Sequence, residues 1–241
     1  MLWVLVMWIA AAAAPLAATV RPARKVSPAP AVVNIVRTKI KPRMVRAYET
    51  QEAAIVQAYE RSHVRLFWTC FQSKKDPTEI LYLNFADSRD AADAWAEVYR
   101  KAIAQHPELV KMTDHLQTLA GVSTTTLTTQ RDEVSFGRSD VDFETLRGLS
   151  LTRFDVLPGH EGRFVRAMRL SAARVSPWAL YEATESSTFF LVAPLKSMSE
   201  GKKKPAIPHL VQELKDSYTI GESTVYAVRP AMSHLKKAER R

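Results

Sequence analysis

Residues 34–42 read Asn-Ile-Val-Arg-Thr-Lys-Ile-Lys-Pro, and 116 positions later residues 150–158 read Ser-Leu-Thr-Arg-Phe-Asp-Val-Leu-Pro. The two stretches align without a gap, so that arginine meets arginine and proline meets proline. Each has the β-branched and alternating residues typical of a strand. Each ends at a proline, which the first turn of a helix tolerates because that N–H has no partner there. The chain is therefore expected to contain the same strand–helix unit twice.

The hydrophobic pattern extends both copies in the same order. Strands are expected over 33–41, 65–72, 79–85 and 123–130 of the first copy, with helices over 42–63 and 88–120. The second copy has shorter elements: strands over 150–157, 178–183, 188–193 and 225–229, a helix from 158 and a second apolar stripe over 207–218. Gly-Val-Ser-Thr at 121–124 matches Gly-Glu-Ser-Thr at 221–224 near the end of each copy. Both copies therefore have the order β-α-β-β-α-β.

This order is that of the ferredoxin-like split βαβ unit. Its helices cover only one face of a four-stranded sheet, so the other face must find a partner. With two copies on one chain, we expect an α+β protein in which two tandem units pack sheet to sheet as an intramolecular α/β barrel.

The strand–proline–helix openings, Lys41-Pro42 and Leu157-Pro158-Gly159, together with the element order, give a resemblance to a known group. Residues 32 to about 230 resemble the dimeric α/β-barrel superfamily, which includes antibiotic-biosynthesis-monooxygenase-like and NIPSNAP-like proteins. The resemblance implies a small-molecule site, in an oxygenase, a haem enzyme, an isomerase or a protein with no known activity. The oxygenases place Asn, Trp and His around an organic substrate. Asn84 and Trp68 are of these types, but no histidine aligns to complete the set.

Charge and cysteine content exclude some functions. The net charge of +9 is concentrated in three segments: the region after the apolar N-terminus, the loop over 196–204 and the C-terminal end. A nucleic-acid-binding protein would carry its basic residues on a folded face, so no nucleic-acid partner is expected. The single cysteine, Cys70, lies in an expected strand and is interpreted as a buried, unreactive thiol.

The expected organisation begins with residues 1–20, an apolar run with small residues near its end. It is interpreted as a cleaved signal peptide of an exported protein, with a retained membrane anchor, or neither, as the alternatives. The remaining divisions are a Pro/Ala-rich spacer over 21–31, the first unit over 32–131, a linker over 132–147, the second unit over 148–230 and a basic tail over 231–241.

Strand alternation suggests which side chains enter the space between the two sheets. If Leu81, Leu83 and Phe85 face the helices, their neighbours point into the barrel, where polar groups among aromatic rings are typical of a ligand pocket. The pocket candidates are Arg37, Trp68, Tyr82, Asn84, Arg153, Trp178 and Tyr181. The competing interpretation is structural: the arginines pair with carboxylates such as Asp155, and the tryptophans belong to the core.

No motif for a metal, a nucleotide or a nucleophilic serine is present, so neither a metal nor a cofactor is expected. The sequence therefore favours an exported protein that binds a small apolar or aromatic molecule, or a non-catalytic scaffold. One alternative is a cofactor-independent monooxygenase-like enzyme acting on an aromatic or phenolic substrate. The other is a protein-interaction module that uses a sheet edge. The oligomeric state is not specified by the sequence.

Overall fold

A computed structural model describes residues 30–135, 146–170, 179–195, 197–199, 214 and 216–235. These residues fall into two compact units. The first unit contains residues 31–126 together with the C-terminal segment from Val228, and the second contains residues 127–227. The end of the chain therefore returns to the first unit, and residues 231–235, which were expected to begin a tail, are part of it.

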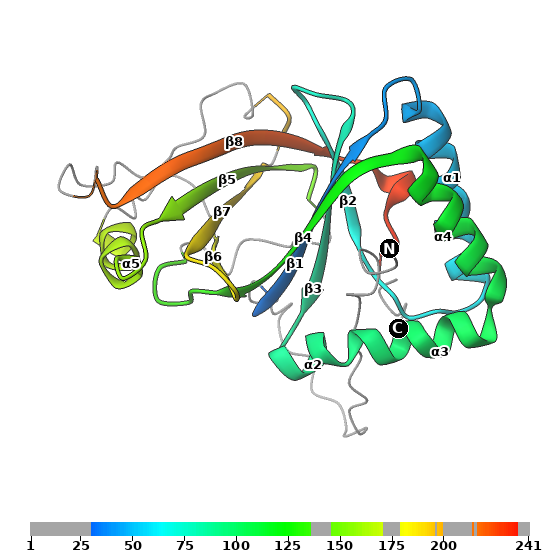
Figure 1. The fold of residues 1–241 in the computed structure, drawn as a ribbon, viewed down its shortest axis with the longest axis horizontal. Coiled ribbons are helices and arrows are strands. Elements are labelled where there is room, and N and C mark those ends of the chain that lie inside the picture. Colours follow the sequence, from blue (N-terminus) through cyan, green and yellow to red (C-terminus); the bar gives the residue numbers. More distant parts are fainter. Residues whose placement is uncertain are drawn as a thin grey trace, which may run out of the picture. The chain divides into compact units, whose positions relative to one another are not determined.

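The first unit contains three complete strands, the start of a fourth and a layer of helices (Figure 1). Its elements are β1 (Val32–Ile40), α1 (Val45–Arg61), β2 (Thr69–Ser73), β3 (Glu79–Ala86), α2 (Arg89–Asp93), α3 (Trp95–Gln105), α4 (Pro107–Leu119), the first part of β4 (Ala120–Gln130) and the 3-10 helix η4 (Pro230–Met232). β3 is the central strand, antiparallel to β1 on one side and to β2 on the other. α1 and α4 lie side by side.

The second unit has the same kind of hairpin sheet. Its elements are β5 (Gly148–Val156), α5 (Glu161–Leu170), β6 (Ala179–Ala183), β7 (Thr188–Leu195) and β8 (Tyr218–Val228). The strands are hydrogen-bonded in the order β8-β5-β7-β6, and the end of β4 pairs with β6 through Thr128 and Ala183. Most of the helix expected over 207–218 lies outside the described residues, but Tyr218, assigned to that helix, is the first residue of β8. The strand expected over 225–229 therefore begins seven residues earlier than predicted.

All eight described strands form one antiparallel series, β1-β3-β2-β8-β5-β7-β6-β4, which closes as a barrel. The predicted α+β class and the barrel are therefore confirmed. β1 and β5 begin 116 residues apart, as do α1 and α5, so the offset seen in the sequence also holds for these elements.

The two prolines do not occupy the helices, as the sequence had suggested. α1 begins at Val45 and α5 at Glu161, each three residues after its proline. The residue after each proline has a left-handed backbone, with φ 66° at Arg43 and φ 83° at Gly159. This conformation reverses the chain and is unfavourable inside a right-handed helix. The strand–proline signal therefore marks a tight turn, and the helix begins after the turn.

The predicted break at Pro107 is confirmed, because α3 ends at Gln105 and α4 begins at Pro107. No helix in the described ranges is both long enough and apolar enough to cross a bilayer. The signal-peptide or anchor prediction for residues 1–20 and nearly all of the 21–31 spacer fall outside the described residues.

Candidate functional site

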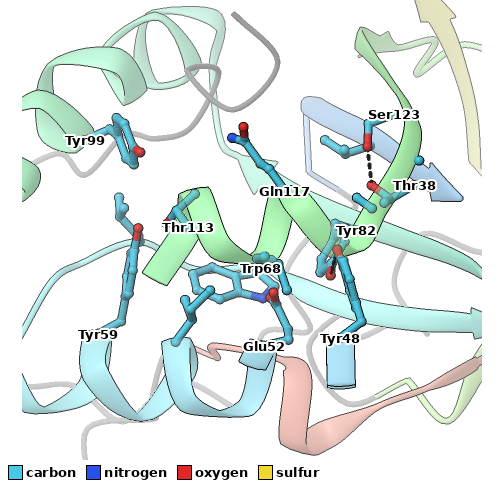
Figure 2. A pocket seen from close by; sticks show the side chains of 16 residues that line it. Thr38, Tyr48, Glu52, Tyr59, Trp68, Tyr82, Tyr99, Thr113, Gln117 and Ser123 are labelled. Carbon is cyan, nitrogen blue, oxygen red and sulfur yellow. Dashed lines mark hydrogen bonds between the residues drawn. The ribbon is translucent and has the colours of Figure 1, made fainter. Parts of the chain in front are cut away.

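A cavity of about 240 Å³ lies in the first unit, between the sheet and the helices that cover it. Its walls combine aromatic rings, aliphatic side chains and a few polar groups (Figure 2). The lining residues are Val36, Thr38, Tyr48, Glu52, Ile55, Tyr59, Leu66, Trp68, Tyr82, Tyr99, Thr113, Leu116, Gln117, Ala120, Gly121 and Ser123.

One face of α1 supplies four of these residues. Tyr48, Glu52, Ile55 and Tyr59 follow one another at intervals of three or four, which places them on the same side of the helix. All four are buried. A carboxyl group is therefore held within an otherwise apolar and aromatic stripe that packs towards the sheet.

The sheet contributes the opposite wall. Val36 of β1 and Tyr82 of β3 are directly paired across the two strands, so both side chains point to the same face. The hydroxyl groups of Tyr82 and Tyr48 are 2.8 Å apart, which joins the sheet to α1 through a buried hydrogen bond. At the β1–β4 side, the hydroxyl groups of Thr38 and Ser123 are 2.9 Å apart.

Glu52 dominates the electrostatics of the cavity. Burial raises the pKa of this carboxyl from 4.5 to about 8, and hydrogen bonds from Trp68 and Tyr82 only partly offset that effect. Burial and the nearby Glu52 also raise the pKa of Tyr48 and of Tyr82 well above the ordinary tyrosine value. The carboxyl is therefore protonated near neutral pH. Among the described lining residues there is no lysine, arginine or histidine to balance its charge when it ionises.

Trp68 is fixed in place by the C-terminal segment. Its indole N–H donates to the carbonyl oxygen of Met232 at 2.8 Å, and its backbone N–H donates to the carbonyl of His234 at 2.9 Å. The rings of Trp68 and Tyr59 meet edge to face, with centroids 5.3 Å apart and planes at 89°. The two rings form a corner of the cavity beside Glu52 (Figure 2).

Two of the seven predicted pocket residues, Trp68 and Tyr82, line this cavity. Tyr82 and Asn84 were expected to point into the barrel, and this orientation was wrong. Tyr82 faces α1, and Asn84, two residues along β3, lies on the same side of the strand. Asn84 donates from Nδ2 to the carbonyl of Phe67 at 2.9 Å and does not line the cavity. Leu81 and Leu83 face the other way and are fully buried, so the apolar character of these leucines did not identify the helix-covered face.

The other predicted residues are not brought together. Arg37 donates to Glu79 at 3.1 Å from Nε, on the sheet face opposite Tyr82. Arg153 pairs with Asp155 of its own strand at 2.8 Å, as the structural interpretation had suggested. Tyr181 is buried in β6 of the second unit, and Trp178 lies outside the described residues.

The sequence interpretation missed the residues that define the chemistry, namely Tyr48, Glu52, Tyr59 and Tyr99. One signal was present: Glu52 occurs within the apolar stripe of an amphipathic helix, where a carboxyl group is unusual unless it has partners. Cys70 is fully buried and its pKa is raised by burial, which agrees with an unreactive thiol.

A histidine does approach the predicted Asn–Trp pair. His234 stacks on Phe67 with ring centroids 5.3 Å apart and lies at the same distance from Trp68. It does not line the cavity, so the three residue types are neighbours without surrounding one space. Within the described part of the chain, no group of His, Cys, Asp and Glu side chains is arranged to hold a metal ion.

No protein-family model matches the sequence, and no curated protein matches it. Solved structures do match. An anthrone oxidase-like protein has a TM-score of 0.54 at 13% identity, over 88% of this chain and 97% of its own. The fold is that of the dimeric α/β-barrel proteins.

Two further structures have the same fold. A chlorite dismutase from Candidatus Nitrospira defluvii, solved with imidazole, has a TM-score of 0.52 at 9% identity, over 84% of this chain and 92% of its own. A protein of Fusobacterium nucleatum, named only provisionally as a monooxygenase, has a TM-score of 0.52 at 10% identity, over 83% and 92%. At these identities the likeness establishes the fold and no activity.

Proposed function

We propose that the first unit binds a small, partly aromatic molecule in the cavity between α1, α4 and the sheet. The observation that carries this proposal is a cavity walled by aromatic rings that contains a buried carboxyl group with no cationic partner among the described lining residues. A purely structural core is close-packed and avoids such groups. Apolar walls with a few well-placed polar groups are the usual composition of a ligand site.

The size of the cavity limits the ligand. A dry cavity of roughly 150 Å³ accommodates benzene, so a space of about 240 Å³ accepts one substituted ring or a molecule of similar bulk. The hydroxyls of Tyr48 and Tyr82 and the Glu52 carboxyl lie where they can bond to a polar substituent. Thr113 and Gln117 of α4 lie on the opposite side of the space (Figure 2).

Calorimetric titration with 2-phenylethanol tests the binding proposal. Thr113→Phe places a ring into the cavity from α4 and should abolish binding, because it occupies the ligand's space. Thr118→Phe is the matched control, since Thr118 lies on the same helix and is exposed. Equal binding by wild type and Thr113→Phe, or no binding of any small aromatic probe by wild type, would refute a ligand site here.

A second function is favoured by Glu52 itself. A carboxyl with a pKa of about 8 that faces a cavity can give or take a proton near neutral pH. Two structural neighbours are named as an anthrone oxidase-like protein and a monooxygenase. In this chain, cofactor-independent oxidation of a phenol would begin with removal of the phenol proton, which Glu52 could accept. Oxygen consumption with hydroquinone or anthrone that is lost in Glu52→Gln would support this function, and unchanged consumption in the variant would exclude Glu52 from it.

We also propose that the two units arose by duplication and that the protein is exported. The shared 116-residue offset of β1 and α1 with β5 and α5 supports the first. The apolar run over residues 1–20 supports the second. N-terminal sequencing of the mature protein decides between cleavage near residue 20 and a retained anchor.

A further inference from the structure

We propose that the ligand of this cavity is a compact organic cation, an amine or quaternary ammonium group on an apolar body, with its nitrogen placed between Glu52 and the ring faces of Trp68 and Tyr59. This inference rests on the proposed function and adds the charge of the ligand to it. It would exclude carboxylates and phosphates as ligands.

The charge balance of the lining residues is the first argument. Glu52 is the only carboxyl group among them, and no lysine, arginine or histidine accompanies it. The cavity therefore carries a charge of zero or minus one. An anionic ligand would meet Glu52 with no opposite charge nearby, whereas a cation would supply the partner that a buried carboxylate needs.

The aromatic walls are the second argument. Five rings line the space, from Tyr48, Tyr59, Trp68, Tyr82 and Tyr99. Trp68 and Tyr59 meet edge to face with centroids 5.3 Å apart, and both line the cavity beside Glu52. Ring faces attract cations, most strongly that of tryptophan, and aromatic cages of this kind recognise alkylated ammonium groups.

The position of Glu52 joins these two features. Figure 2 shows its carboxyl beside the indole of Trp68, with Tyr82 and Tyr48 on one side and Tyr59 on the other. Four titratable groups interact electrostatically with it, Tyr48 and Tyr59 from α1, Tyr82 from β3 and Cys70 from β2, and burial raises the pKa of each. His234 contacts the rings of Trp68 and Tyr59 but does not line the cavity. None of the four groups is a cation, and the described lining residues include no lysine, arginine or histidine. A bound ammonium group would therefore bring the positive charge that these residues do not supply to Glu52.

Binding of a cation then has a proton linkage. The carboxyl is protonated at pH 7 in the empty cavity and must ionise to pair with the ligand, so a proton is released. Affinity for a quaternary ammonium ion should rise about 50-fold from pH 6 to pH 8 and then level off, as expected for a pKa of about 8. A quaternary ion has no proton of its own, so the released proton reports on the protein.

The test titrates the full chain with three probes that share one aromatic body: 2-phenylethylamine, 2-phenylethanol and phenylacetate. At pH 8.5 we expect the amine to bind at least tenfold more tightly than the alcohol, and phenylacetate not to bind. Glu52→Gln, which keeps the size of the side chain but cannot ionise, should remove that preference for the amine over the alcohol. Glu60→Gln, an exposed carboxylate of the same helix, is the control and should retain the preference.

Proton release on binding of benzyltrimethylammonium to the wild type, measured in buffers of different ionisation enthalpy, needs no variant. Alcohol binding equal to or tighter than amine binding overturns the cation inference while the proposed function stands. A preference for the amine that survives in Glu52→Gln overturns the role of Glu52. Failure of all three probes to bind overturns the proposed function itself.

Discussion

The two units differ at corresponding positions on their helix-covered sides. In the first unit these positions line a cavity, whereas among the described residues of the second they form a cluster of buried apolar and aromatic side chains. At the 116-residue offset, Tyr48 corresponds to Phe164 and Glu52 to Met168. Tyr82, the strand partner of Val36, corresponds by register to Leu191, the partner of Thr152.

In the second unit the rings of Phe164 and Phe189 pack with centroids 4.9 Å apart, within a cluster that includes Phe154, Met168 and Leu191. Apolar side chains at these positions satisfy the fold without any polar group. The tyrosine–glutamate–tyrosine set of the first unit is therefore not required by the architecture. This difference supports the ligand site proposed for the first unit.

The largest expected effect is a pH dependence confined to the first unit. The pKa of Glu52 is about 8 in the folded protein and 4.5 in its ordinary state, so between these values only the folded state keeps the proton. Stability should therefore fall as pH rises from 4.5 to 8, by up to about 5 kcal/mol. Urea unfolding at pH 5, 6.5 and 8 should show this slope in wild type and a flatter one in Glu52→Gln. Parallel slopes would show that Glu52 does not titrate in this way.

The second unit should respond to loss of packing. Phe164→Ala removes a fully buried ring from the centre of the aromatic core and should lower the free energy of unfolding by about 4 kcal/mol. Phe164→Leu, which keeps most of the volume, should lower it by about 1 kcal/mol. Denaturant unfolding of all three proteins at one fixed pH gives both values, because the contribution of Glu52 is then the same in each. A loss below about 2 kcal/mol for the alanine variant would contradict a close-packed core.

The sequence was sufficient for the fold because the fold depends on local periodicity that occurs twice. Most of the strands, α1 and the break at Pro107 follow from patterns within a few residues. β8 was predicted too short, because its first half, from Tyr218, had no clear strand pattern. The turns after the two prolines were missed because a proline in the first turn of a helix and a proline just before a left-handed residue have the same sequence signature.

The site was harder to predict because both faces of β3 are buried. Alternation separates the residues of a strand into two sets but does not say which set faces the helices when both are apolar. Leu81 and Leu83 on one side and Tyr82 on the other are all buried. The anchoring of Trp68 by Met232 depends on residues 164 positions apart, and no local pattern reports such a contact.

A smaller effect should follow when the first unit is made to resemble the second at one position. Tyr48→Phe introduces the side chain found at Phe164 and removes one hydroxyl from the 2.8 Å contact with Tyr82. The loss should be about 1 kcal/mol, because Tyr82 keeps Glu52 as a partner. Unfolding of Tyr48→Phe and of the double variant Tyr48→Phe/Glu52→Gln would show coupling between the two positions. Strict additivity would mean that the hydroxyls and the carboxyl do not form one network.

The smallest effects should come from the two corresponding arginines. Arg37 bonds to Glu79 across β1 and β3, with side-chain exposures of 25% and 14%, whereas Arg153 bonds to Asp155 of its own strand at 46% and 37%. A partly buried pair between strands stabilises more than an exposed pair within one strand, because solvent screens the latter. We therefore expect Arg37→Ala to lower the free energy of unfolding by about 1 kcal/mol and Arg153→Ala by a few tenths.

Unfolding at 0.05 M and 1 M salt separates the two cases, since added salt should weaken the Arg153 pair more. A larger loss for Arg153→Ala would show that this arginine has a role in the second unit beyond its pair with Asp155.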